Sequence, residues 1–188
     1  MRQLRSNHSN RASAQRGVTL MEVVVTMAIA AILIGIGAPS FRYITTSDRI
    51  SGEVNSLLGD MQYARAEAIK EGQTVSVCAA ASNDTSCSGS DTWNTGWLVF
   101  SGSGSQPAGS ADILLVRGAF NGGDSFEPLD GTTSVVHFNR EGFAPGVAAG
   151  AVTFQLHDSS DKSTYTRCLY LTLMGMPTTQ TYGERKCS

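Results

Sequence analysis

A continuous apolar run is the first strong feature of the chain. From Val18 to Ala38 nearly every residue is apolar, and as a helix this run would span about 31 Å, close to the hydrocarbon thickness of a bilayer. Beyond it, apolar residues recur at three- and four-residue intervals as far as Ala68, which indicates an amphipathic helix. Gly72 supplies a stop signal, and Lys70 lies in the last turn. We therefore expect one long helix that crosses a membrane and enters a folded domain, with Pro39 as the candidate kink.

The pattern changes to a period of two after this helix. Val75 and Val77 alternate with polar residues, and more short candidate strands follow, separated by clusters of Gly, Ser, Asp and Asn. Short strands after one helix predict an α+β fold, in which antiparallel sheet covers the apolar stripe of the helix. Residues Ser101–Asp112 are expected to form a flexible polar loop. The further candidate strands are Trp97–Ser101, Ile113–Phe120, Ser134–Asn139, Val152–His157 and Cys168–Leu173.

Charge is distributed unevenly along the 188 residues. The whole chain has 14 Lys and Arg against 16 Asp and Glu, but the first 17 residues contain four arginines and no acid. Basic residues beside a membrane segment stay on the cytoplasmic side, so the domain that follows is expected to be exported. That outer part is acidic, which disfavours nucleic acid as its main partner, because such binding depends on phosphate neutralisation.

Four cysteines, Cys78, Cys87, Cys168 and Cys187, all follow the apolar run. In an oxidising compartment an even number of cysteines predicts disulfides, here two, and three pairings would be consistent with the sequence. We favour local closure, Cys78–Cys87 and Cys168–Cys187, of which the second would restrain the C-terminal tail. The closely spaced cysteine pairs of zinc sites are absent from the sequence.

Glu22 is an ionisable residue one turn inside the apolar run. Such a residue costs about 2.5–3.5 kcal/mol at the bilayer centre and less near an edge, so it usually faces a partner. Cleavage after Gly17 would create a free amine on Val18, four residues away on the same helix face. That amine could pair with Glu22 within one chain or between neighbouring chains. The alternative is that Glu22 lies near the headgroups and extends toward water.

This N-terminal segment resembles the type III signal of the type IV pilin superfamily. The resemblance rests on Arg16-Gly17, the sequence Val18-Thr19-Leu20-Met21-Glu22 and an apolar helix that reaches Pro39. It implies that a prepilin peptidase cuts after Gly17 and methylates Val18. It also implies that Glu22 aids subunit assembly and that Pro39 kinks the helix. Val18 departs from the family pattern, which usually has Phe at this position.

Three further segments are similar to the minor pilins and pseudopilins of the GspH/FimT/FimU group: Tyr63–Cys78, Gly96–Phe100 and Val135–Ala144. The resemblance implies a pilin-like fold with a leader peptide (1–17), a transmembrane assembly helix (18–39) and a periplasmic domain (40–188). The N-terminus would be cytoplasmic, and the chain would pass once through the inner membrane before joining an extracellular pilus.

The implied function is pilus assembly, in the tip or priming complex, in support of twitching, adhesion or DNA uptake. The implied partners are other minor pilins, the major pilin, the prepilin peptidase and the inner-membrane assembly platform. The resemblance implies no cofactor, no metal and no enzymatic activity. One alternative is a pseudopilin of a type II secretion system, which would form a periplasmic pseudopilus.

A second alternative is a DNA-binding minor pilin. Some relatives bind DNA through a Gly-Arg-x-Arg motif, but the matching place here reads Gly175-Met176-Pro177-Thr178 and lacks both arginines. Candidate DNA contacts are then Arg167, Arg185 and Lys186, and DNA binding is not favoured.

A third alternative is a secreted enzyme with an ordinary signal peptide cleaved near Ala38. His137 and His157 lie in candidate strands without sequence neighbours that suggest a nucleophile or a metal partner, and no catalytic motif is present. Trp97 is expected in the core; Trp93 is also expected to pack, with a surface contact as the alternative.

Overall fold

The computed structural model describes residues 17–82, 85–120, 122–147, 150–184 and 187, without the side chains of 38–40. The chain divides into two units, Met1–Arg42 and Tyr43–Ser188, which are treated separately below. A single helix, α1 (Leu20–Glu71), contains the predicted helical stretch except Val18 and Thr19, which are non-helical. The expected placement of Val18 and Glu22 on one helix face is therefore not seen in this structure. It ends as expected at Gly72, which has φ +68° and donates its N–H to the Ala68 carbonyl at 3.0 Å.

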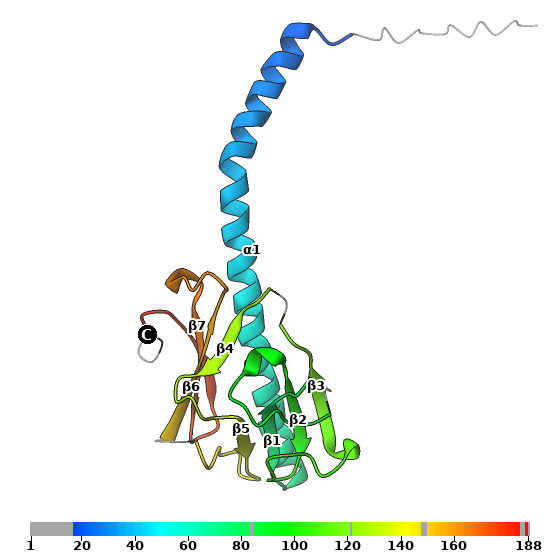
Figure 1. The fold of residues 1–188 in the computed structure, drawn as a ribbon, viewed down its shortest axis with the longest axis vertical. Coiled ribbons are helices and arrows are strands. Elements are labelled where there is room, and N and C mark those ends of the chain that lie inside the picture. The colour runs from blue at the N-terminus through cyan, green and yellow to red at the C-terminus, as the bar shows by residue number, and fades with distance from the viewer. Residues whose placement is uncertain (1–16, 83–84, 121, 148–149, 185–186, 188) are drawn as a thin grey trace, which may run out of the picture. The chain divides into compact units, whose positions relative to one another are not determined.

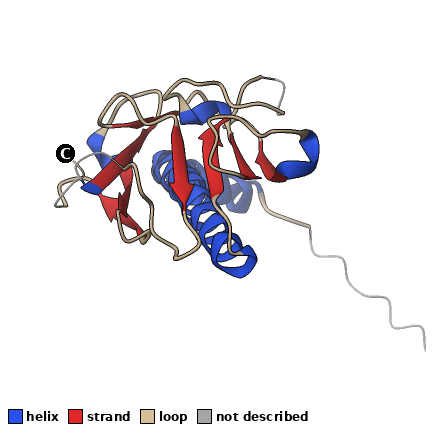
Figure 2. Ribbon diagram, turned by 90° about the horizontal axis from the view of Figure 1, so that it is seen from below, coloured by secondary structure: helices blue, strands red, loops and turns tan. Residues whose placement is uncertain are grey.

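Two four-stranded sheets lie within the described residues, and every strand pair in them is antiparallel. The first has the order β3-β2-β1-β5, and the second has the order β4-β6-β7-β8. Figure 1 shows the fold, and in Figure 2 the strands lie over one side of α1. The strands of the first sheet are β1 (Val75–Ala79), β2 (Trp97–Ser101), β3 (Ile113–Arg117) and β5 (Val135–Phe138). The strands of the second are β4 (Ser125–Pro128), β6 (Ala151–His157), β7 (Arg167–Thr172) and β8 (Pro177–Thr181).

The two strands that the sequence did not predict, β4 and β8, are both at an edge of the second sheet. Their sequences, SFEP and PTTQT, lack the apolar alternation that identified the other strands. Proline is tolerated at strand ends and sheet edges, where a missing N–H breaks no ladder. The segment after β7, interpreted from sequence as a loop, therefore contains a strand, which pairs with β7 from Leu171↔Pro177 to Arg167↔Thr181.

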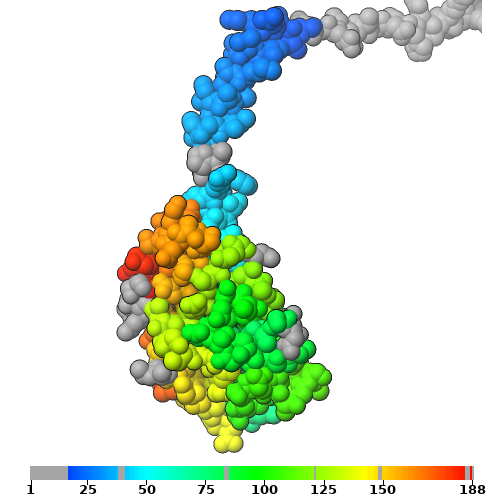
Figure 3. Space-filling view, in the orientation of Figure 1, coloured from blue at the N-terminus to red at the C-terminus, as the bar shows by residue number. Residues whose placement is uncertain are grey.

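The core lies between α1 and the two sheets. On the face that Figure 3 shows, the green part of the chain lies beside the yellow and orange part that follows it in sequence. Trp97 is buried as expected. Trp93 is also fully buried, packs edge-to-face on Phe154 and donates its indole N–H to the Thr133 carbonyl at 2.9 Å. The alternative of an exposed contact residue at Trp93 was therefore wrong. The buried stripe of α1 consists of Ile50, Val54, Leu57, Met61, Ala64 and Ala68.

A buried carboxylate fixes α1 to the first sheet. Asp60 is 6% exposed. It accepts the indole N–H of Trp97 at 2.8 Å and two N–H groups of Arg117, from Nε at 3.0 Å and Nη2 at 2.9 Å. These bonds satisfy both oxygens of Asp60 and connect the helix to β2 and β3. They also raise the pKa of Arg117, because its charged form is the hydrogen-bond donor.

A second ionic cluster connects α1 to the segment before β4. Arg49 Nη2 donates to Asp124 Oδ1 at 2.7 Å, and the Asp124 side chain is fully buried. Glu53 Oε2 and Asp124 Oδ2 are buried and lack a hydrogen-bond partner among the described residues. Burial, followed by the charge of Asp124, raises the pKa of Glu53 to about 7, although Arg49 opposes the shift. A proton shared between the two carboxyl groups would satisfy both oxygens, so we expect Glu53 to be protonated below neutral pH.

Stability is expected to fall as pH rises from about 5 to 8, because of Glu53. The pKa of Glu53 is about 7 in the folded state, against an ordinary value of 4.5. The stabilisation of the folded state by protonated Glu53 is therefore complete below pH 4.5 and is lost as pH rises through 7. Because Glu53 is partly exposed, we expect a change of only about 1–2 kcal/mol. Denaturant unfolding at several pH values measures it. The Glu53→Gln variant should remove this pH dependence, and Glu127→Gln, on the exposed side of β4, should keep it; equal slopes in both variants would contradict the assignment.

Candidate assembly site

The N-terminal part of α1 presents apolar side chains on every side. All described residues from Gly17 to Gly37 are exposed, with Leu20 at 82% and Ile36 at 70%. An 18-residue window of α1 has a mean hydropathy of 2.4, and none of that window is buried, so the helix is long and apolar enough to span a membrane. A helix that is apolar all round is stable only in lipid or among other apolar helices.

Thr19 is the N-cap of this helix, and Glu22 is the third helical residue. The backbone N–H of Glu22 lies 3.2 Å from Thr19 Oγ1 and 3.1 Å from the Thr19 carbonyl oxygen. The sequence Thr19-Leu20-Met21-Glu22 therefore has the spacing of a capping box, with a hydroxyl residue followed three positions later by a glutamate. Sequence analysis missed this arrangement, although the spacing alone could have identified it.

Two roles for Glu22 are thus consistent with its position. A carboxylate in the first turn is favoured by the helix dipole and by the capping box. The amine that we expect as its partner exists only after cleavage between Gly17 and Val18. In the uncleaved chain no salt bridge to Glu22 is found among the described residues. The pairing of Glu22 with an amine remains a prediction.

The expected cleavage site lies just outside the helix. Residues 17–19 are non-helical, and Gly17 and Val18 are exposed, so the peptide bond between them is not protected by helical hydrogen bonds. The leader before Gly17 lies outside the described residues. Pro39 lies within the bounds of α1, but its side chain is not described, so its role as a kink remains a prediction.

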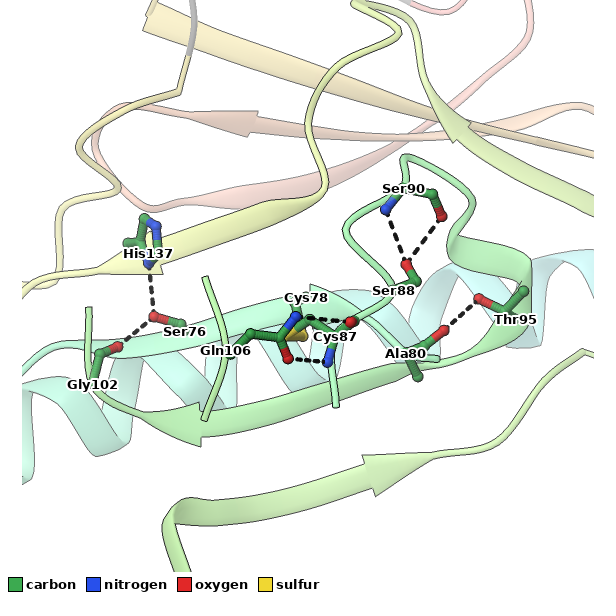
Figure 4. The surroundings of a disulfide bond; sticks show 10 residues. All are labelled: Ser76, Cys78, Ala80, Cys87, Ser88, Ser90, Thr95, Gly102, Gln106 and His137. Carbon is green, nitrogen blue, oxygen red and sulfur yellow. Dashed lines mark hydrogen bonds between the residues drawn. A yellow bond between two sulfur atoms is a disulfide. The ribbon is translucent and has the colours of Figure 1, made fainter. Parts of the chain in front are cut away.

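The first disulfide joins Cys78 on β1 to Cys87, with an S–S distance of 2.06 Å. The side-chain amide of Gln106 is bonded to both backbone groups of Cys87: Oε1 accepts its N–H at 2.8 Å, and Nε2 donates to its carbonyl at 2.9 Å (Figure 4). The loop Ser101–Asp112, expected to be flexible, is therefore held at Gln106 against the disulfide loop.

The second disulfide joins Cys168 on β7 to Cys187 in the tail, with an S–S distance of 2.07 Å. Both cysteines are buried. The tail also turns back on itself, because Gly183 donates its backbone N–H to the Cys187 carbonyl at 2.7 Å and Cys187 donates its own to the Glu184 carbonyl at 2.7 Å. The tail is thus fixed against the second sheet beyond its last strand.

Each candidate histidine contacts a serine across a strand pair, which sequence neighbours could not reveal. Ser76 Oγ donates to the Gly102 carbonyl at 2.5 Å and lies 2.7 Å from His137 Nδ1 (Figure 4). Because its one proton is given to Gly102, Ser76 must accept from Nδ1–H, and His137 cannot act as its base. Burial also lowers the pKa of His137. Both residues therefore have a structural role.

The other pair, Ser125 and His157, is equally unsuited to nucleophilic chemistry. Ser125 Oγ lies 3.0 Å from Nδ1 and 2.8 Å from Nε2 of His157. The hydroxyl therefore faces the edge of the imidazole ring between the two nitrogens and is aligned with the lone pair of neither. Asp161 Oδ1 is 3.4 Å from Nδ1, but the Asp161 side chain is 83% exposed. In the part of the chain that the structure describes, no group of three or more His, Cys, Asp or Glu could hold a metal ion.

Of the three candidate DNA contacts, only Arg167 is described; Arg185 and Lys186 lie outside the described residues. Arg167 Nη1 donates to the carbonyls of Thr164 and Thr166 at 3.2 and 2.9 Å, and Nη2 lies 3.5 Å from Ser47 Oγ. These bonds hold the short turn before β7 and connect it to α1. DNA contact by the three residues remains a prediction.

Comparison with known families identifies the chain. The family described as "Type II transport protein GspH" matches residues 53–175. The chain belongs to the GspH family. The family described as "Prokaryotic N-terminal methylation motif" also matches, over residues 12–38, which includes the expected cleavage site and Glu22. The resemblance to the GspH/FimU group of the type IV pilin superfamily is thereby confirmed.

Two crystal structures of the type IV minor pilin FimU of Pseudomonas aeruginosa (strain PAO1) are similar to this GspH-family chain. One, in space group P21, has a TM-score of 0.59 and 17% identity over 77% of this chain and 96% of FimU. The other, in P65, has a TM-score of 0.56 and 17% identity over 69% and 91%. At this identity they show the fold alone, which is the predicted α+β pilin fold. Comparison with curated proteins gives no match.

Proposed function

We propose that this chain is a minor type IV pilin, which is inserted into the inner membrane by residues 18–39 and incorporated into the tip or priming complex of a pilus. A prepilin peptidase cuts it after Gly17 and methylates Val18. The assembly platform then adds it to a filament that contains other minor pilins and the major pilin. The domain of residues 40–188 is exported, and the arginine-rich leader stays in the cytoplasm.

The observation that carries this proposal is the fully exposed apolar segment of α1 inside a methylation motif. Membrane anchoring and assembly both need such a surface, since an exposed helix of this kind must be covered by lipid or by other helices. Members of pilin families assemble with one another, and the FimU structures share this fold. The proposed mechanism is therefore packing of subunits rather than catalytic turnover.

A second candidate is a pseudopilin of a type II secretion system, because the matching family is described as a type II transport protein. Both candidates use the same signal, helix and domain. Deletion of the gene separates them: loss of twitching or piliation supports the pilus, and loss of exoprotein secretion supports the pseudopilus.

Intact-mass measurement of the membrane-extracted mature protein tests the processing steps. We expect a chain that begins at Val18 and carries one additional methyl group. Treatment with reductant should add the mass of hydrogens for two disulfides, Cys78–Cys87 and Cys168–Cys187. A soluble chain that begins near Ser40 would contradict the proposal and support a secreted protein with an ordinary signal peptide.

A further inference from the structure

Two tight turns and the C-terminal part of α1 meet at one end of the domain. Ala144 donates its backbone N–H to the Leu173 carbonyl at 2.9 Å, which joins the loop after β5 to the β7–β8 turn. Each turn has a buried glycine with positive φ, Gly142 at +81° and Gly175 at +69°. A Cβ atom at Gly175 would collide with the carbonyl oxygen of Gly142. The two turns therefore pack backbone to backbone, and Figure 1 shows the end of α1 and the loop after β5 at the same end of the domain.

These turns, together with Ile69 of α1, display large apolar side chains to solvent. We call this set the distal patch; all of its members are exposed, by 42–61%. Backbone bonds fix the turns, from Gly142 N–H to the Asn139 carbonyl at 2.8 Å and from Gly175 N–H to the Thr172 carbonyl at 2.9 Å. A fixed apolar surface loses little conformational entropy on binding, and methionine adapts to varied partners. The distal patch consists of Ile69, Phe143, Leu173, Met174 and Met176.

A cation without an acidic partner adjoins the distal patch. Arg65 Nε donates to the Gly142 carbonyl at 2.9 Å, and Nη1 lies 3.3 Å from the sulfur of Met176, which is a weak acceptor. No carboxylate forms a salt bridge with Arg65 among the described residues. The nearby charges of Arg140 and Glu141 bind each other at 2.8 Å. The guanidinium of Arg65 is thus oriented by its neighbours and retains the capacity to bind a carboxylate.

We propose that the distal patch and Arg65 bind the globular domain of a different pilin subunit, through an apolar surface that carries one carboxylate. This inference rests on the proposed function, which places the chain among other pilins. A two-fold dimer of this chain through the distal patch is disfavoured, because the patch would then face itself and supplies no carboxylate for Arg65. A single arginine is also a poor recognition element for anionic lipid, which attracts clusters of basic residues.

Site-specific photo-crosslinking of the full chain, in the cells that produce it, tests this contact. A benzoylphenylalanine probe replaces Met174, and a second probe replaces Ile29 in the apolar part of α1. A control probe replaces exposed Thr164, at the other end of the domain, where the adjacent Tyr165 packs on Tyr43. Crosslinked products are identified by mass spectrometry.

The Met174 probe is expected to crosslink to a different protein that itself carries a prepilin-type N-terminus, about tenfold more than the Thr164 probe. Arg65→Glu should lower this yield about tenfold, whereas Arg65→Lys, which keeps the charge, should largely preserve it. Met176→Ser, which leaves the bond from Arg65 to Gly142 in place, should also lower the yield. Each of these results would support the contact.

Other products would overturn it. If the Ile29 probe crosslinks to pilins while the Met174 probe gives a dimer of this chain, a lipid adduct or no product, the distal patch is not the contact and the proposed function stands. If neither probe crosslinks to a pilin, both the contact and the proposed function fail. Equal yields for Arg65→Glu and Arg65→Lys would exclude a role for the charge.

Discussion

Replacing Glu22 with alanine is expected to leave membrane insertion intact and to reduce incorporation into filaments about tenfold or more. Insertion depends on the apolar side chains around Glu22, which are unchanged, and removal of an ionisable side chain from a membrane segment makes insertion easier rather than harder. Assembly depends on the carboxylate if it pairs with an N-terminal amine among packed helices, where an unpaired charge is costly. The measurement compares the amount of the chain in the membrane with the amount in sheared filaments.

The capping box gives this experiment a matched control. Glutamine at the same position can replace glutamate in a capping box, but it has no charge. If pairing with an amine is the role of the side chain, Glu22→Gln should fail to assemble, as Glu22→Ala does. Thr19→Ala removes the hydroxyl that accepts the Glu22 backbone N–H and should cost only about 1 kcal/mol of local helix stability. Normal assembly of Glu22→Gln would show that Glu22 acts through capping and not through its charge. Normal assembly of Glu22→Ala would show that assembly needs neither the capping nor the charge of Glu22.

Elements with strong local patterns could be predicted from the sequence. The α1 helix has a long apolar run, a regular stripe up to Ala68 and a glycine that ends it, and each of these signals is contained in neighbouring residues. The six strands that were predicted have alternating or continuously apolar residues. The pairs Cys78–Cys87 and Cys168–Cys187 follow from proximity in the chain, because short loops are the easiest to close.

The rest depends on contacts between distant segments. Strand β8 has threonines in place of the apolar alternation by which a strand is recognised in a sequence. It is a strand because β7 offers a free edge with which it can pair. The pairing of Ser76 with His137 depends on the register of β1 and β5. The contact of Arg65 with the Gly142 turn spans 77 positions. Sheet register and turn packing determine these contacts, and neither is encoded in a short window of sequence.

Contacts between distant segments also determine where residues can be substituted without loss of the fold. The Gly17–Gly37 segment is exposed throughout, so substitutions there are expected to change membrane and subunit contacts rather than the stability of the domain. The distal patch is a further exposed surface, but it rests on two turns whose glycines cannot be replaced without strain. Substitutions at Met174 and Met176 are therefore better probes than substitutions at Gly142 or Gly175.

Replacement of Asp60 with alanine is expected to destabilise the domain by about 3 kcal/mol. The indole N–H of Trp97 would lose its acceptor inside the core, and an unsatisfied buried donor costs about 1–3 kcal/mol. Arg117 would lose two charge-assisted bonds. Its side chain is 45% exposed, so water can replace part of that interaction, which limits the loss.

Denaturant unfolding of the mature chain in detergent, followed by tryptophan fluorescence, measures this effect, because Trp93 and Trp97 are both buried in the folded domain. Asp60→Asn retains an acceptor for Trp97 but loses the charge that Arg117 binds, so it should cost less than Asp60→Ala. Glu141→Ala removes the exposed pair with Arg140 and should leave the midpoint unchanged. If Asp60→Ala unfolds at the same denaturant concentration as Glu141→Ala, the bonds of Asp60 to Trp97 and Arg117 do not fix α1 to the first sheet.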